Sequence, residues 1–123
     1  MKPGRTGLGR LIDATGNSFR GLTAAFRKEA AFRQELALAA VLLAGSFWLA
    51  DSALEWLVLV VPLFVLLIVE LLNSAIESVV DRIGDERHVL SGQAKDMGSA
   101  AVLLSLGLIA ACWGAVAWRH LVA

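Results

Sequence analysis

The polar side chains of residues 70–81, with the sequence ELLNSAIESVVD, form the strongest chemical pattern in the chain. An α-helix turns about 100° per residue, so one face of this segment carries five polar side chains: Glu70, Asn73, Ser74, Glu77 and Asp81. The segment follows fourteen residues without a charge, which places the face inside a membrane or at its edge. A charge at the bilayer centre costs about 2.5–3.5 kcal/mol on insertion scales, and such residues usually mark functional sites. The pattern therefore predicts a site, and a polar seam that only joins helices is the alternative.

A second group of charges lies in residues 29–35, with the sequence EAAFRQE. Glu29 and Arg33 are four residues apart, a spacing that is also common on ordinary solvated helices. Hard cations such as Mg²⁺ prefer carboxylate and phosphate oxygens. If Glu29 and Glu77 meet at one membrane interface, we expect them to share a divalent cation.

A third group is GQAKDMGS, residues 92–99, in which Lys95 and Asp96 precede a long apolar run. A lysine here can neutralise a phosphate, and the neighbouring acid can orient that lysine or bind ribose hydroxyls. Charges that only anchor a membrane span are the alternative. The sequence contains neither a P-loop nor the protein-kinase signatures. A phosphotransferase of this sequence would therefore assemble its site from helix ends, which suits a reaction that needs mainly positioning and charge neutralisation.

The rest of the chain predicts the elements that carry these groups. Hydrophobic residues make up 58% of the 123 residues and mean hydropathy is +0.70, which is more apolar surface than a small soluble domain can bury. We expect one all-α membrane domain over residues 1–123, with an amphipathic surface helix at about 7–27 and spans at about 29–50, 54–81 and 93–119. The residues between the second and third spans, 81–88, and Ser91-Gly92 are expected to form a loop, and residues 51–55 a short acidic turn. The formal net charge of zero gives no support for nucleic-acid binding.

The distribution of Lys and Arg predicts the orientation. Seven precede the uncharged run 36–50 of the first span, three lie from Arg82 to Lys95, none lies in the 51–55 turn, and one follows the third span. The positive-inside rule then places the N-terminus and the 81–96 loop in the cytoplasm, and the acidic turn and C-terminus on the other side. All three chemical groups would then lie at the cytoplasmic face.

Taken together, these motifs resemble the small prokaryotic diacylglycerol kinase family. The resemblance runs through EAAFRQE, VELLNSAIESVVDRIG, the segment Glu86-Arg87-His88 and SGQAKDMGSAAVLL, and it covers about residues 7–111. It implies a homotrimer in the bacterial inner membrane, with a surface helix and three spans in each subunit. It also implies phosphorylation of diacylglycerol to phosphatidic acid, with ATP as co-substrate and Mg²⁺ as cofactor.

The resemblance also implies roles for single residues. Glu70 matches the general base that takes the proton of the lipid hydroxyl, and Asn73 supports the site. Glu29 and Glu77 match the carboxylates that hold Mg²⁺ on ATP. Nucleotide contacts are implied for Arg10, Glu86, Arg87, His88, Lys95 and Asp96, and lipid contacts for Arg10, Arg33, Gln34, Glu70 and Ser99. Asn17 falls at a nucleotide-site position where relatives carry an aromatic residue, which puts a contact there in doubt.

Three other functions fit part of the pattern. An undecaprenol kinase would share the polar motifs, although EAAFRQE favours the diacylglycerol branch of the resemblance. A small transporter or ion channel would use the intramembrane carboxylates to line a pathway, but it gives no purpose to Lys95 and Asp96. A purely structural membrane subunit would tolerate the loss of Glu29 and Glu77.

Overall fold

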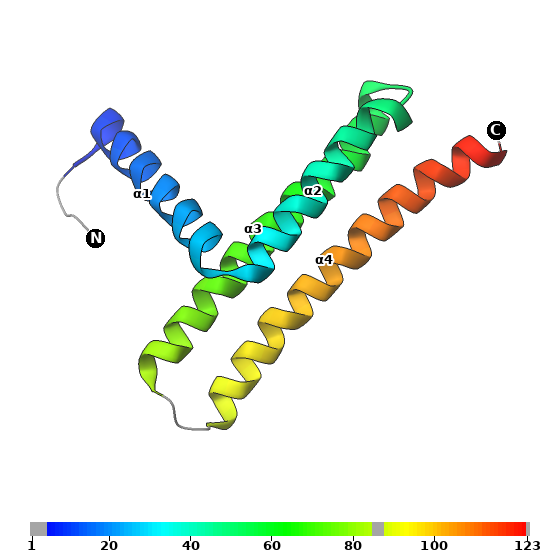
Figure 1. The fold of residues 1–123 in the computed structure, drawn as a ribbon. Helices are drawn as coiled ribbons and strands as arrows, with labels where there is room; N and C mark the ends of the chain where they lie inside the picture. The colour runs from blue at the N-terminus through cyan, green and yellow to red at the C-terminus, as the bar shows by residue number, and fades with distance from the viewer. Residues whose placement is uncertain (1–4, 85–87, 123) are drawn as a thin grey trace.

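The protein is an all-α membrane protein of four helices, seen in a computed structural model that describes residues 5–84 and 88–122 (Figure 1). The helices are α1 (Gly7–Lys28), α2 (Ala30–Leu49), α3 (Ala53–Ile83) and α4 (Val89–Val122). α2, α3 and α4 are long and apolar enough to cross a membrane. α1 departs at an angle from the other three (Figure 1).

α1 has the surface expected of an interfacial helix. Its large apolar side chains form a stripe at helical spacing and are all exposed, namely Leu8, Leu11, Ile12, Phe19, Leu22 and Phe26. Its last turn is basic, with Arg27 and Lys28. Such a helix lies in the membrane surface with its apolar stripe towards the acyl chains.

The corner between α1 and α2 is held by Arg33. Glu29 leaves the helical conformation, with φ −113° and ψ 107°, so that the last carbonyls of α1 have no helical partner. The Arg33 guanidinium donates to the carbonyl oxygens of Phe26 at 2.7 Å and Arg27 at 3.2 Å. A cation at a helix C-terminus is also favoured by the helix dipole. Arg33 is thus a capping residue, and the expected pair with Glu29 is not among the ion pairs of the described residues.

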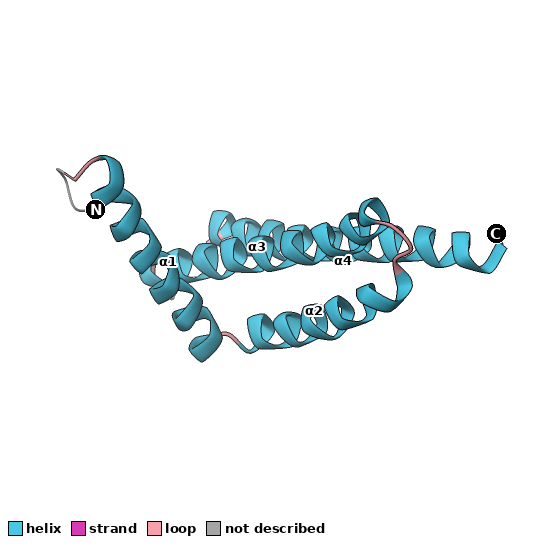
Figure 2. Ribbon diagram, turned by 90° about the horizontal axis from the view of Figure 1, so that it is seen from above, coloured by secondary structure: helices cyan, strands magenta, loops and turns pink. Residues whose placement is uncertain are grey.

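α3 packs against both α4 and α2. Figure 2 shows α3 and α4 running together with α2 on one side of them. The apolar core joins these three helices through Ala39, Leu63, Leu66 and Ile109. Trp113 of α4 adds a polar link, because its indole N–H donates to the Leu59 carbonyl at 3.0 Å. This bond lies one turn before Pro62, which has no N–H for the helix ladder.

The structure corrects several predicted boundaries. α4 begins at Val89 rather than 93 and ends at Val122 rather than 119, so Ser91 and Gly92 are helical. α3 extends to Ile83, so the predicted loop is shorter than 81–88. The predicted turn 51–55 is also shorter, because the Ser52 hydroxyl accepts from the Glu55 N–H at 3.1 Å and caps α3. A helix continued by one turn satisfies more backbone groups than a loop, and polar residues at a membrane surface tolerate either state.

Candidate functional site

The buried face of α3 changes from apolar to polar at Glu70. Its buried residues before this point include Leu59, Leu63 and Leu66, and its buried residues after it are Glu70, Asn73 and Ser74. The same helical stripe that forms the core therefore continues as a row of polar side chains. Glu70 is only 3% exposed, and Asn73 and Ser74 are buried as well, so this part of the predicted polar face points at protein and not at lipid.

Three further carboxylates lie close enough to Glu70 to act on it electrostatically, those of Glu35, Glu77 and Glu29. They come from α2, from α3 and from the corner between α1 and α2. The structure therefore brings together the three acids predicted from the sequence, and it adds Glu35, which sequence analysis missed. Its spacing was informative, because Glu35 lies three residues after the buried Phe32 and four before the buried Ala39, on the inner face of α2.

None of these four carboxylates is in an ion pair among the described residues. Several carboxylates close together repel one another unless a cation lies among them. Carboxylate oxygens are the protein ligands that Mg²⁺ takes. Glu29 and Glu77 thus have the donor chemistry for a hard divalent cation. The group of three ligating side chains within 4.8 Å of one another, among the described residues, is instead Asp51, Glu55 and His120.

Asn73 connects this cluster to α4. Its amide N–H group points at the Glu77 carboxylate at 3.5 Å, while its carbonyl oxygen Oδ1 is buried without a hydrogen-bond partner. That oxygen lies against the backbone of Gly98, where a β-carbon would collide with it. An orphaned buried acceptor is costly, and the contact with Gly98 leaves this oxygen enclosed between α3 and α4 among the described residues.

A pocket of about 530 Å³ lies between α1 and α3 beside the carboxylates. Glu29 and Ser74 are among its lining residues, together with Lys28 and small residues of both helices. Ser74 is one helical turn after Glu70. The pocket is therefore a space lined by Glu29 and by the turn of α3 that follows Glu70, into which a substrate head group could enter from the membrane surface.

The predicted nucleotide and lipid residues lie in more than one part of the structure. Lys95 donates to Asp81 at 2.9 Å, Asp96 and Ser99 are exposed, and His88 accepts from the Leu90 N–H at 3.1 Å. Arg10 and Asn17 line a different pocket, formed only by residues 5–20. The structure does not bring these two into contact with the carboxylates. Gln34 is exposed, and Glu86 and Arg87 lie outside the described residues.

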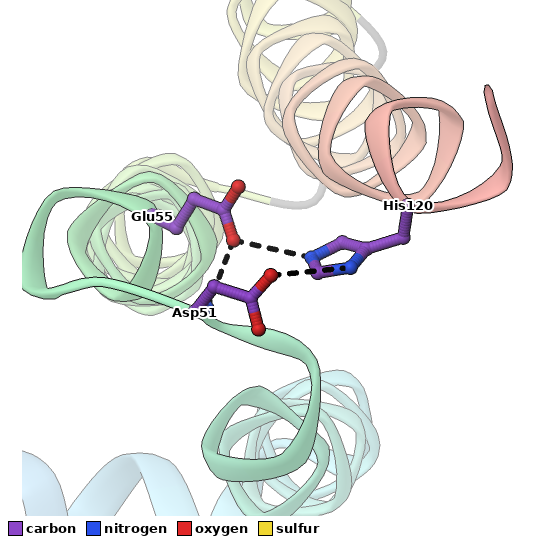
Figure 3. Close-up of side chains that lie close together, drawn as sticks. All are labelled: Asp51, Glu55 and His120. Atoms are coloured by element: carbon purple, nitrogen blue, oxygen red, sulfur yellow. Dashed lines mark hydrogen bonds and ion pairs between the residues drawn. The ribbon is translucent and has the colours of Figure 1, made fainter. Parts of the chain in front are cut away.

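A separate charged cluster lies at the opposite end of the bundle (Figure 3). His120 contacts Asp51 at 3.5 Å through Nδ1 and Glu55 at 3.2 Å through Nε2, and Arg119 is also paired with Glu55. It links the last turn of α4 to the turn between α2 and α3. Sequence analysis assigned it no role, and it lies at the other end of α3 from Glu77.

Comparisons with known proteins decide the family. The model of the family described as prokaryotic diacylglycerol kinase matches residues 16–117. The chain belongs to the prokaryotic diacylglycerol kinase family. The diacylglycerol kinase of Escherichia coli (strain K12) is 47% identical over 120 residues, with 98% of each chain covered. The diacylglycerol kinase of Pseudomonas aeruginosa is 50% identical over 113 residues, with 92% of each chain covered. That of Haemophilus influenzae is 46% identical over 111 residues, covering 90% of this chain and 94% of the relative.

Membership in the prokaryotic diacylglycerol kinase family makes the chain an enzyme of the kinase class, as the resemblance predicted. The matched residues 16–117 contain the four carboxylates, Asn73, Lys95 and the whole of α3. The charged cluster around His120 lies partly outside that match. The region shared with the prokaryotic diacylglycerol kinase family is therefore the region that contains the polar face of α3.

Proposed function

We propose that the protein transfers a phosphoryl group from MgATP to the hydroxyl of diacylglycerol, giving phosphatidic acid, at the cytoplasmic surface of the bacterial inner membrane. The observation that carries the proposal is Glu70, a buried carboxylate that begins the polar part of the inner face of α3 and on which the charges of three other carboxylates act. The proteins named diacylglycerol kinase, which are 46–50% identical to this chain, support the choice of lipid.

Glu70 is the proposed general base. An alcohol is a poor nucleophile, so a carboxylate within hydrogen-bond reach must accept its proton as the bond to phosphorus forms. Asn73 points its amide N–H at the Glu77 carboxylate at 3.5 Å, on the same face of α3. The reaction thus needs an in-line approach of lipid hydroxyl and γ-phosphate beside α3.

Glu29 and Glu77 are the residues that would hold Mg²⁺, which neutralises charge on the phosphates when it is bound. ATP would reach Glu29 and Glu77 from the cytoplasm. Lys95 and Asp96, near the start of α4, would contact the nucleotide there. We assign the remaining nucleotide positions from the family resemblance: Arg10, Asn17, Glu86, Arg87 and His88. Asn17 accepts a hydrogen bond from Arg20, so it is the weakest of these assignments.

The lipid would approach through the pocket between α1 and α3, because a diacylglycerol keeps its chains in the bilayer and presents its hydroxyl at the surface. The pocket combines apolar walls with Glu29 and Ser74. We assign contacts with the lipid head group to Arg10, Arg33, Gln34, Glu70 and Ser99. Homotrimer assembly belongs to the same proposal, and the small residues of α4 would permit close contact between helices.

The test is a phosphorylation assay on purified protein in lipid, with radiolabelled γ-phosphate ATP and Mg²⁺. Diacylglycerol and undecaprenol are offered in parallel. Label in phosphatidic acid that falls by about 100-fold or more in Glu70→Gln would support both the activity and the base. Glu55→Gln is the matched control, because it removes a carboxylate from the other end of the same helix. Omission of Mg²⁺ is expected to abolish transfer in every variant.

Other outcomes would replace parts of the proposal. Label that appears only in undecaprenyl phosphate would change the substrate and leave the mechanism in place. Near-normal turnover by folded Glu70→Gln would show that Glu70 is not the general base. If the folded protein binds ATP but labels neither lipid, a transporter whose pathway is lined by the polar face of α3 becomes the better hypothesis.

A further inference from the structure

We propose that Asp81 is a positioning residue that holds the Lys95 ammonium beside the proposed phosphate site. This inference rests on the proposed function, since it concerns the residue assigned to the ATP phosphates. Asp81 was recognised in the sequence only as the last member of the polar face of α3. No role in binding or catalysis follows from that alone.

The first observation is the ion pair between the two helices that flank the cytoplasmic loop. Lys95 Nζ donates to Asp81 Oδ1 at 2.9 Å, across 14 residues of sequence. The Asp81 side chain is 67% exposed and that of Lys95 45% exposed. Exposed ion pairs contribute little to stability because water and salt screen them. The main effect of this pair is therefore to fix the position of the Lys95 ammonium, and its contribution to stability is small.

The second observation is the place of the pair on α3. Asp81 lies four residues after Glu77, one turn further along the same helical face. The charge of Glu77 also acts on the Lys95 ammonium. Asp81 is therefore the direct partner of Lys95, and Glu77 is a second carboxylate whose charge acts on it. Lys95 and Glu77 are therefore the cation and the carboxylate of this face that would serve the phosphates of one nucleotide.

The ion pair with Asp81 restricts a side chain that is otherwise flexible. A free lysine side chain samples many rotamers, and ordering it on a ligand costs entropy. Asp81 removes part of that cost before ATP binds. An ammonium group has three N–H donors, so a bond to Asp81 leaves two for phosphate oxygens. Asp81 can thus position Lys95 without competing with the nucleotide.

The experiment uses the full-length protein in lipid and measures kcat and the KM for each substrate. Asp81→Asn keeps the size of the side chain and removes its charge. We expect the KM for MgATP to rise by about 5-fold, with kcat and the KM for diacylglycerol unchanged. Asp51→Asn is the matched control, because it removes an exposed, paired carboxylate at the opposite end, and it should leave all three parameters unchanged.

A double-mutant cycle separates positioning from a general structural effect. Equilibrium dialysis with radiolabelled MgATP gives the affinity of each variant, including those too slow to assay. Asp81→Asn should weaken binding in the wild-type background and should have no further effect in Lys95→Ala. Equal weakening in both backgrounds, or an unchanged KM for MgATP in active Asp81→Asn, would overturn the inference. An inactive wild-type protein would instead overturn the proposed function, so the two failures are distinct.

Discussion

The side chain of Asn73 in α3 lies directly against the backbone of Gly98 in α4. A β-carbon at residue 98 would overlap Asn73 Oδ1, and Gly98 itself is buried. The absence of a side chain at residue 98 is therefore what allows the two helices to approach with an amide between them. The same contact fixes the amide that points at Glu77.

Gly98→Ala should consequently damage both packing and activity. Overpacking of a close contact costs about 1–3 kcal/mol, and the displaced Asn73 would no longer hold Glu77. We expect a lower thermal unfolding midpoint in lipid or detergent and a decrease in kcat. Gly107→Ala is the matched control on the same helix, because a β-carbon there meets nothing within 4 Å. If both variants behave alike, the contact between Asn73 and Gly98 does not limit the site.

Much of the fold could be predicted because helical period and charge-free length are written directly in the sequence. The polar face of α3 follows from spacing alone, and its burial follows from the cost of exposing Glu70 to lipid. Glu35 and Gly98 could not be assigned in the same way, because their neighbours depend on how α2 and α4 cross α3. The lengths of α3 and α4 were underestimated because nothing in the polar loop sequence stops a helix before Ile83.

The contact between Asp51 and His120, in contrast, joins two segments whose proximity follows from the membrane topology. Sixty-nine positions separate these residues in the sequence. The predicted topology nevertheless places the turn after the first span and the C-terminus on one side of the membrane. The contact between the turn and the end of α4 could therefore have been predicted from topology. Which residue of the last turn of α4 makes the contact depends on the rotation of the helix about its axis, and the apolar sequence of α4 defines that rotation poorly.

Arg33→Gln should loosen the corner between α1 and α2. The variant loses both bonds from the guanidinium to the carbonyls of Phe26 and Arg27, and the loss of a cation at a helix end typically costs about 0.3–1 kcal/mol. We expect faster amide hydrogen exchange near residues 26–33 and little change in the core of α3. Arg33→Lys keeps the charge without the planar fork and should be intermediate. Unchanged exchange in Arg33→Gln would contradict the capping role.

Trp113→Phe should lower stability without affecting the proposed site. The substitution keeps an aromatic ring but removes the N–H that donates to the Leu59 carbonyl, and a lost hydrogen bond costs about 0.5–1.5 kcal/mol. Thermal unfolding in detergent measures the effect, and Trp118→Phe, at an exposed position, is the control. A loss confined to Trp113→Phe would establish the link next to Pro62. An equal loss in both variants would point to a general effect of removing tryptophan.

Arg119→Gln should weaken the far end of the bundle and leave catalysis unchanged. Arg119 and His120 both contact Glu55. His120 also contacts Asp51, and Figure 3 shows both contacts of His120. Because these groups are at the surface, their attraction is screened by salt. We therefore expect a small decrease in the unfolding midpoint at low ionic strength that shrinks in concentrated NaCl.

The comparison of wild type and Arg119→Gln at both ionic strengths contains its own control, since a packing defect would persist in concentrated salt. Lipid phosphorylation measured on the same samples should stay within about 2-fold of wild type, because surface substitutions away from a site have small effects. A salt-independent decrease would mean that Arg119 acts through packing. A large loss of activity would mean that the two ends of α3 are coupled, since Glu55 and Glu70 lie four turns apart on one continuous helix.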